Sequence, residues 1–272
     1  MLLVIDVGNT NTVIGTLKTP SSRRGPASVV HRWRITTSAR TTDESGLLLL
    51  ELLGHRGISP EAIEGTMISC VVPSTLYAWE KACRRYLSTE PMIVGRSIST
   101  GMRVRTDNPR EVGADRIVNA VAAYAKHGCA LVVVDFGTAT TLDCVNDAGD
   151  YVGGAIAPGF RISADALFLR TAKLPRVEVE RPKRAIGTNT IECIQSGLFW
   201  GYVGLVDGLA RRCKEELVDQ NTERSTADVP CVATGGMANL VGRSCEEIDE
   251  VDEDMTLRGL SILWDRNRRT RR

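Results

Sequence analysis

The sequence opens with the stretch Met1-Leu-Leu-Val-Ile-Asp6-Val-Gly8-Asn9-Thr10-Asn11-Thr12. Residues 2–5 are all apolar, which is typical of a short strand buried on both faces, and Asp6 places a carboxylate at the end of that strand. Gly8 lets the backbone turn sharply and approach a ligand closely, because it carries no Cβ. Hydrogen-bonding side chains follow directly, so the stretch favours a phosphate-binding turn. The alternative is a tight hairpin capped by Asx and Thr turns.

The same order of residues recurs in the second half of the chain, at Leu131-Val-Val-Val-Asp135-Phe-Gly137-Thr138-Ala139-Thr140-Thr141. This repeat lies close to half of the 272 residues beyond the first copy. At one constant offset, three residues match: Asp6 with Asp135, Gly8 with Gly137, and Thr12 with Thr141. A duplication at half-length predicts two similar α/β domains, each with one phosphate-facing turn.

Two such turns could hold the phosphates of a nucleotide in a shared cleft. Asp6 and Asp135 would repel those phosphates unless a cation neutralised the charge. The repeated carboxylates therefore also predict a bound metal ion, since carboxylate oxygens are ligands that hard cations prefer.

The composition indicates a soluble globular protein, because hydrophobic residues make up 43% and charged residues 25% of the chain. The formal net charge of +1 gives no global field toward nucleic acid or a membrane surface, so we expect neither partner. Apolar runs such as residues 47–50 and 130–134 are far too short to span a bilayer. Because Met1 leads directly into a predicted core strand, we expect no signal peptide and a cytoplasmic location.

A loop before the second copy carries a further carboxylate, Asp115. Pro109 and Gly113 mark this loop, and residues 117–126 predict a helix, so Asp115 falls at the start of that helix. One interpretation is a capping or first-turn acid that complements the helix dipole. The other is a general base presented from a loop, with the adjacent Arg116 available to bind an anionic group of the substrate.

A long helix is predicted over residues 191–217, and glycines recur along one face of it. They are Gly197, Gly201, Gly204 and Gly208. Glycines at this spacing permit close packing of helices, including packing against a second copy of the chain. This face is a candidate homodimer interface, and packing within one chain is the alternative.

Six motifs stand in one characteristic order along the chain. They are Asp6-x-Gly8-Asn9-Thr10, Asn108-Pro109-x-Glu111-Val112-Gly113-Ala114-Asp115-Arg116, Asp135-x-Gly137-Thr138-Ala139-Thr140-Thr141, Gly153-Gly154-x-Ile156-x-Pro158-Gly159, Gly187-x-Asn189-Thr190 and Thr234-Gly235-Gly236. In these motifs, and over essentially its whole length, the sequence resembles the type III pantothenate kinases of the acetate and sugar kinase/Hsp70/actin superfamily.

That resemblance implies an α/β fold of two related actin-like (ribonuclease H-like) domains, with mixed sheets flanked by helices and an ATP cleft between the domains. We expect an N-terminal actin-like domain over residues 1–114 and a C-terminal one over residues 115–272. The implied fold agrees with the duplication inferred from the repeated turn.

The resemblance also implies ATP-dependent phosphorylation of pantothenate to 4'-phosphopantothenate, the first step of coenzyme A biosynthesis. Asp115 would accept the hydroxyl proton as general base. The ATP phosphates would be bound by Thr138 and by the first turn, which comprises Asp6, Val7, Gly8, Asn9, Thr10, Asn11, Thr12 and Val13. The pantothenate pocket would be lined by Thr106, Gly113, Ala114, Asp115 and Arg116, and by Thr190 across the interface of a homodimer.

Two kinds of cation follow from the same resemblance. Asp135 would bind a monovalent cation, K⁺ or NH4⁺, and Asp6 would be oriented toward a divalent ion, Mg²⁺. Phosphoryl transfer needs positioning and charge neutralisation more than covalent chemistry. Cations and glycine turns that bind the phosphates, together with one carboxylate that activates the alcohol, are therefore the groups that this reaction needs.

One position departs from the family pattern. Where the family commonly has a Tyr shortly before Asn-Pro, this sequence has Thr106, which cannot supply the same apolar area to the pantothenate pocket. We interpret the change as tuning of substrate binding that leaves the catalytic residues intact.

Two other functions are compatible with such a sequence. One is a catalytically silent relative with a regulatory role, and the presence of Asp6, Asp115 and Asp135 together argues against it. The other is a kinase of the same superfamily that acts on another small molecule, such as a sugar or acetate, which the segment 113–116 disfavours.

Overall fold

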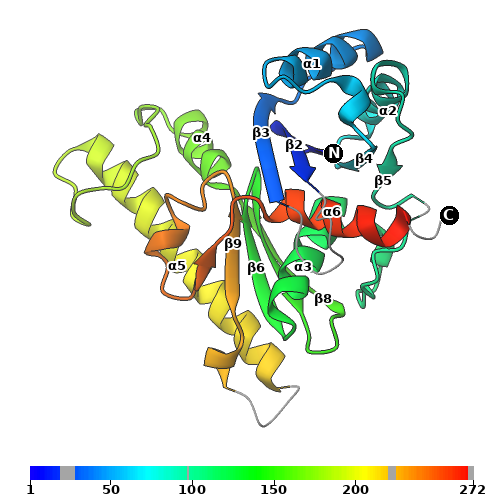
Figure 1. The fold of residues 1–272 in the computed structure, drawn as a ribbon. Coiled ribbons are helices and arrows are strands. Elements are labelled where there is room, and N and C mark those ends of the chain that lie inside the picture. Colours follow the sequence, from blue (N-terminus) through cyan, green and yellow to red (C-terminus); the bar gives the residue numbers. More distant parts are fainter. Residues whose placement is uncertain (19–27, 97, 220–224, 269–272) are drawn as a thin grey trace. The chain divides into compact units, whose positions relative to one another are not determined.

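The computed structural model describes residues 1–18, 28–96, 98–219 and 225–268, and each half of the chain begins with three consecutive strands that are followed by helices (Figure 1). The strands are β1 (Leu2–Val7), β2 (Asn11–Lys18), β3 (Ser28–Thr36), β4 (Gly65–Cys70), β5 (Met92–Ile93), β6 (Leu131–Phe136), β7 (Ala139–Val145), β8 (Tyr151–Pro158), β9 (Cys231–Gly235) and β10 (Glu250–Val251). The α-helices are α1 (Thr42–Gly54), α2 (Pro73–Leu87), α3 (Ala114–His127), α4 (Phe160–Arg170), α5 (Thr190–Asp219) and α6 (Met255–Arg268). Short 3-10 helices are η1 (Pro60–Ala62), η2 (Pro109–Glu111), η3 (Thr226–Asp228) and η4 (Gly242–Ser244).

Each half of the chain forms a five-stranded sheet, and the two sheets share one topology. The first has the order β3-β2-β1-β4-β5, and the second, taken from its other edge, has the order β8-β7-β6-β9-β10. In both, the central strand pairs antiparallel with the next strand of the chain and parallel with the strand on its other side. The shared topology confirms the duplication predicted from the repeated turn, and the mixed sheets with flanking helices confirm the α/β class.

The two repeated turns differ in length by one residue. Val7 at the end of β1 pairs with Thr12, whereas Phe136 at the end of β6 pairs with Thr140. The structural equivalent of Thr12 is therefore Thr140, and both side chains are buried. The match of Thr12 with Thr141 was wrong, because a constant offset in the sequence does not detect a deletion inside a turn.

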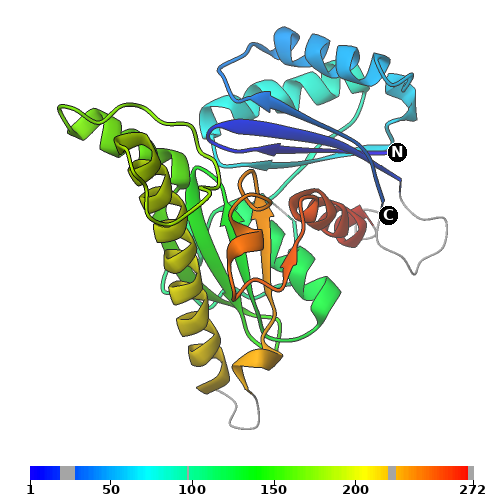
Figure 2. The same cartoon turned by 90° about the vertical axis from the view of Figure 1, so that its left-hand side faces the viewer.

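Helices cover both faces of the first sheet (Figure 2). On one face, α1 and α2 pack on β1 and β4 around a core that includes Leu49, Ile68 and Trp79. On the other face, α6 lies against the same two strands. The approach of α6 is close, because a Cβ added at Gly65 would lie 2.6 Å from the indole nitrogen of Trp264.

The long helix α5 runs beside the second sheet (Figures 1 and 2). It contributes Phe199, Val206 and Ala210 to a core shared with Val134 of β6 and Leu142 of β7. This core fixes the strands that carry the second turn.

The contacts divide the chain into two compact units, Met1–Met102 with Arg110–Ala122 and Asp254–Arg272, and Arg103–Pro109 with Ala123–Glu253. The first part of α3 and all of α6 thus pack with the first sheet. A close contact explains this, since a Cβ added at Gly259 of α6 would lie 2.3 Å from the carbonyl oxygen of Val118 in α3. These units differ from the ranges 1–114 and 115–272, which stay a prediction about the domains.

Candidate active site

The first predicted phosphate turn connects β1 to β2. Asp6 is half-buried near the end of β1, and the N–H of Gly8 donates a 3.1 Å hydrogen bond to the carbonyl oxygen of Asn11, which closes the turn. The residues at its tip, 9–11, are exposed. This hairpin contains every residue predicted to bind ATP in the first half of the chain, namely Asp6, Val7, Gly8, Asn9, Thr10, Asn11, Thr12 and Val13.

A residue that sequence reasoning missed holds this turn in place. The Thr37 hydroxyl, just after β3, donates a 2.7 Å hydrogen bond to the carbonyl oxygen of Gly8 and lies 2.8 Å from Oγ1 of Thr12. Its backbone N–H donates a 2.9 Å bond to the carbonyl oxygen of Thr10. The sequence signal is a run of hydroxyl residues before α1, which by itself predicts helix capping, although Thr41 alone provides the cap.

Ser69 lies next to Asp6 on the first sheet. The two are direct partners in the parallel pairing of β1 with β4, so their side chains lie on the same face. The Ser69 hydroxyl is buried and has no hydrogen-bond partner within the described part of the chain. A carboxylate beside such a hydroxyl matches the oxygen ligands that Mg²⁺ takes, so these residues fit a divalent ion.

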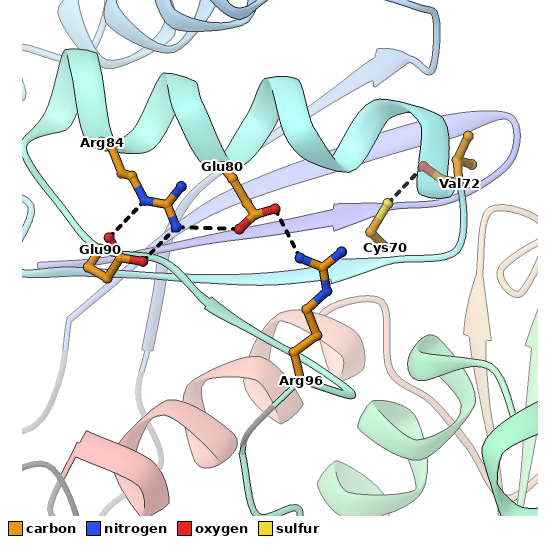
Figure 3. Close-up of polar contacts among 6 residues, drawn as sticks. All are labelled: Cys70, Val72, Glu80, Arg84, Glu90 and Arg96. Carbon is orange, nitrogen blue, oxygen red and sulfur yellow. Dashed lines mark hydrogen bonds and ion pairs between the residues drawn. The ribbon is translucent and has the colours of Figure 1, made fainter.

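Cys70, which ends β4, has the properties of a structural thiol. Its Sγ donates a 3.2 Å hydrogen bond to the carbonyl oxygen of Val72 (Figure 3). Burial raises the pKa of the Cys70 thiol, and the negative charge of Asp6 raises it further. The thiol therefore stays protonated at neutral pH and is no nucleophile for this site.

Asp115 lies in the first turn of α3. Its Oδ1 accepts a 2.8 Å hydrogen bond from the backbone N–H of Arg116. Burial raises the pKa of the Asp115 carboxyl, although the bond from Arg116 opposes the shift. A Cβ added at Gly113 would lie 2.6 Å from Oδ1, so a larger residue there would displace the carboxylate from this position. The position is that of a first-turn acid, and the raised pKa suits a proton acceptor.

The second predicted turn connects β6 to β7. Asp135 is half-buried, the N–H of Gly137 donates a 3.1 Å hydrogen bond to the carbonyl oxygen of Ala139, and Thr138 is exposed at the tip. The glycine motif of residues 153–159 packs against this turn, since a Cβ added at Gly159 would lie 2.0 Å from the carbonyl oxygen of Thr138. The role of Gly159 was not evident from the sequence.

The surroundings of Asp135 fit a cation. Gly235 at the end of β9 has φ of +95°, and a Cβ added there would lie 2.5 Å from Oδ1 of Asp135. Thr141 is the direct partner of Asp135 across the β6–β7 pair, so its hydroxyl lies on the same face. Gly235 therefore packs directly against the carboxylate, where a side chain would collide, and the Thr141 hydroxyl lies on the same face of the sheet. Asp135 and Thr141 both offer oxygen ligands.

Thr106 belongs to a short segment that lies beside β8. The backbone N–H of Arg105 donates a 2.8 Å bond to the carbonyl oxygen of Tyr151, and the N–H of Tyr151 donates one of the same length to the carbonyl oxygen of Arg103. Thr106 follows directly and is half-buried. These bonds hold the backbone next to Thr106, the residue that we predict to line the pantothenate pocket.

Thr190 begins α5 and lines a cavity of about 580 Å³ together with Leu167, Leu174 and Asn189. Asn189 caps the helix, since its Oδ1 accepts a 3.0 Å bond from the N–H of Glu192. The cavity combines an apolar wall with polar groups at a helix N-terminus, which suits a small polar ligand.

The predicted glycine face of α5 is open. Among the described residues, nothing lies within 4 Å of a Cβ added at Gly197, Gly201 or Gly204. Large apolar side chains near this face are exposed, among them Trp200 of α5 and Leu169 of α4.

The candidate residues divide between the two compact units. Asp6 and residues 113–116 belong to the first, whereas Thr106, Asp135, Thr138 and Thr190 belong to the second. Over the described ranges no cluster of three or more His, Cys, Asp or Glu side chains forms a metal site, so each proposed cation relies on one carboxylate of the protein. In the same ranges no helix is long and apolar enough to cross a membrane.

Comparison of the sequence with known proteins identifies the family to which it is similar. A family model described as type III pantothenate kinase matches residues 2–212. The type III pantothenate kinase of Syntrophotalea carbinolica is 52% identical over 269 residues, which cover 98% of this chain and 100% of that protein.

Solved structures of low sequence identity share the fold. A protein from Campylobacter jejuni described as belonging to the Baf family of transcriptional activators matches with a TM-score of 0.58 and 16% identity, over 97% of both chains. A protein from Sinorhizobium meliloti described as a 2-dehydro-3-deoxygalactonokinase matches with a TM-score of 0.51 and 13% identity, over 97% of this chain and 96% of that one. The likeness to a sugar kinase confirms the expected actin-like architecture of two related halves.

Proposed function

The chain belongs to the type III pantothenate kinase family, and on that premise we propose which residues carry the phosphorylation of pantothenate by ATP. The reaction yields 4'-phosphopantothenate and opens coenzyme A biosynthesis. The observation that carries the assignment of the general base is the half-buried carboxylate of Asp115 in the first turn of α3, whose pKa is raised by burial.

The two glycine turns bind the phosphates of ATP. In the first, residues 6–13 offer backbone N–H groups and hydroxyls, and Thr37 holds their conformation. In the second, Thr138 adds a hydroxyl at an exposed tip. Fixed donors of this kind stabilise the charge of a transferring phosphoryl group without reorganisation.

Asp115 acts as the general base. Its Oδ1 accepts a hydrogen bond from the N–H of Arg116, which leaves Oδ2 to take the proton of the pantothenate hydroxyl. The hydroxyl oxygen attacks the γ-phosphorus of ATP, and ADP leaves. The raised pKa brings the proton affinity of the carboxylate closer to the operating pH, which favours general-base catalysis. Gly113, Ala114 and Arg116 surround the carboxylate and line the acceptor pocket.

Two carboxylates hold cations in this proposal. Asp135, with the Thr141 hydroxyl on the same face, would hold K⁺ or NH4⁺, and Asp6 beside Ser69 would hold Mg²⁺. When bound, these ions neutralise the charge of the phosphates. Asp135 and Asp6 would position these ions, and the cation at Asp135 would reduce the repulsion between that carboxylate and the phosphates of ATP.

The acceptor pocket also takes Thr106 and Thr190, and the enzyme works as a homodimer joined through the open glycine face of α5. The support for the dimer is that face itself: Cβ atoms added at Gly197, Gly201 or Gly204 would have no described residue within 4 Å, and large apolar side chains such as Trp200 are exposed. Solvation of such a surface is unfavourable compared with its burial against a second copy.

The test is a coupled assay of ADP release with pantothenate, in the presence and absence of K⁺ or NH4⁺ at constant ionic strength. We expect turnover that requires pantothenate and rises with the monovalent cation. ADP release that ignores pantothenate in every salt would contradict the function, whereas turnover that requires pantothenate but ignores the cation would contradict only the role of Asp135.

A further inference from the structure

A buried carboxylate outside the proposed site, Asp143 of β7, is held by two hydroxyl groups. Oδ2 accepts a 3.0 Å hydrogen bond from the hydroxyl of Thr141, and Oδ1 accepts a 2.7 Å bond from the hydroxyl of Tyr151. Asp143 is 0% exposed and Tyr151 is 1% exposed. Burial of a carboxylate costs free energy even when it accepts hydrogen bonds. We therefore expect Asp143 to have a function that offsets this cost.

One end of this network lies at the proposed cation site. Thr141 and Asp143 are two residues apart on β7 and share a face of the sheet, and Thr141 is the direct partner of Asp135. Side chains so paired have Cβ atoms about 5 Å apart. Because the Thr141 hydroxyl donates its one proton to Asp143, its lone pairs stay available to a cation at Asp135.

The other end lies at the proposed pantothenate wall. Tyr151 exchanges two backbone hydrogen bonds with Arg103 and Arg105, and Thr106 is the next residue. The side chain of Arg105 also forms an ion pair with Asp150, beside Tyr151. The network therefore runs from Asp135 to the segment of Thr106 within one compact unit.

We propose that Asp143 is a positioning residue, which directs the lone pairs of Thr141 toward the cation held by Asp135 and, through Tyr151, couples that cation to the wall of the pantothenate pocket. The inference rests on the proposed role of Asp135. Without Asp143, the Thr141 hydroxyl can turn its proton toward Asp135 and oppose the cation. Without the Tyr151 hydroxyl, the segment of Thr106 is no longer linked to Asp143.

The purely structural alternative is that the Tyr151–Asp143 bond only fastens β8 to β7, whose pairing shifts in register between Cys144 and Val145, and that the Thr141–Asp143 bond only orders β7. That role would change stability but would not make the cation and pantothenate depend on each other. Reciprocal dependence of two ligands is the property that separates the two readings.

The experiment compares wild type with Asp143→Asn, Tyr151→Phe, Thr141→Val and Thr141→Ser in the full-length chain. For each we measure the K⁺ concentration for half-maximal activation, the KM for pantothenate at low and at saturating K⁺, and the KM for ATP. The rise in Tm produced by KCl over choline chloride gives K⁺ binding without catalysis. The matched control is Tyr86→Phe, which removes a 2.7 Å tyrosine–aspartate bond to Asp43 at the surface.

We expect Asp143→Asn, Tyr151→Phe and Thr141→Val to raise the K⁺ requirement by about tenfold, which is the effect of losing one hydrogen bond to a charged group. K⁺ should raise their Tm less than that of wild type and should no longer lower the KM for pantothenate, while the KM for ATP stays unchanged. Thr141→Ser, which keeps the hydroxyl, should restore wild-type behaviour, and Tyr86→Phe should match wild type.

An unchanged K⁺ requirement in the soluble variants, or an equal rise in the KM for ATP, would overturn the proposal. If Asp143→Asn does not fold, the comparison of Thr141→Val with Thr141→Ser decides, since identical K⁺ dependence of these two would also overturn it. Wild type reports separately on the proposed cation site: if K⁺ neither activates it nor raises its Tm, the role of Asp135 fails first.

Discussion

The hydroxyl of Thr37 donates a 2.7 Å hydrogen bond to the carbonyl oxygen of Gly8, across the turn that we assign to the ATP phosphates. Since the same residue also contacts Thr12 and Thr10, it fixes the turn at three points. Preorganised N–H groups bind a phosphate better than a turn that must be ordered on binding.

Thr37→Val should therefore raise the KM for ATP about three- to tenfold, which corresponds to one lost hydrogen bond, and leave the KM for pantothenate nearly unchanged. Thr37→Ser should restore the wild-type value. Thr89→Val is the control, because it removes a buried hydroxyl pair with Thr66 of 2.7 Å in the same unit. If Thr37→Val and Thr89→Val changed the KM for ATP equally, Thr37 would contribute to the stability of the fold and have no specific role in ATP binding.

The pH profile should report the raised pKa of Asp115. Because the base must be ionised, kcat/KM for pantothenate falls as the pH drops through that pKa, and the midpoint lies above the value of about 3.9 for an ordinary Asp. An acidic limb centred at or below the ordinary value would contradict the role of burial at this site.

Stability should show the cost of ionising Asp115. The folded pKa lies above the unfolded one, so the folded state binds the proton more tightly and loses stability as the pH rises between the two values. Asp115→Asn should thus raise the Tm at neutral pH, and the gain should vanish below the unfolded pKa. Thermal unfolding at pH 7.5 and 3.5 measures this, and a lower Tm at pH 7.5 would favour the capping interpretation.

Gly235→Ala should remove activation by K⁺. The added methyl would lie 2.5 Å from Oδ1 of Asp135 and would therefore displace the carboxylate that we assign to the cation. Gly128→Ala is a matched control, since Gly128 also has a positive φ, of +65°, and nothing among the described residues lies within 4 Å of its added Cβ. Both substitutions carry the strain of a left-handed residue, about 1–2 kcal/mol, and Gly235→Ala also places its methyl 2.7 Å from the backbone of Phe136. Measured at a temperature where both variants are folded, only Gly235→Ala should lose the dependence on K⁺.

The oligomeric state should depend on the glycine face of α5. Gly204→Gln adds a side chain that meets no described atom of its own chain within 4 Å of Cβ, so the fold should tolerate it. Light scattering should give the mass of a dimer for wild type and of a monomer for the variant, with unchanged circular dichroism. The exposed Glu216→Gln on the same helix is the control, and a monomeric wild type would contradict the interface.

Local pattern was sufficient for the two turns, because an apolar strand, an acid, a glycine and hydroxyls are consecutive in each. The duplication predicted from them is confirmed by the shared order of strands. The one-residue difference between the turns was missed, since Thr140 and Thr141 are both hydroxyl residues and only the pairing of Phe136 distinguishes them.

Contacts between distant segments could not be predicted. The bond of Thr37 to Gly8 depends on the return of β3 to β2, and the bond of Tyr151 to Asp143 depends on a register shift at β8. The packing of α6 likewise depends on two close approaches that glycine permits, of Gly259 to Val118 and of Gly65 to Trp264, and periodicity does not reveal them. The role of Asp115 as general base was predicted from the family resemblance. The partial burial of its side chain could be seen only in the folded structure.

The most direct test of the account is Asp115→Asn, measured for pantothenate-dependent ADP release and, separately, for ATP binding by calorimetry. If Asp115 is the general base, turnover falls by at least a hundredfold while the affinity for ATP stays within about twofold of wild type, since the carboxylate is used in the transition state. Retained turnover, or a loss of ATP affinity equal to the loss of turnover, would contradict the account.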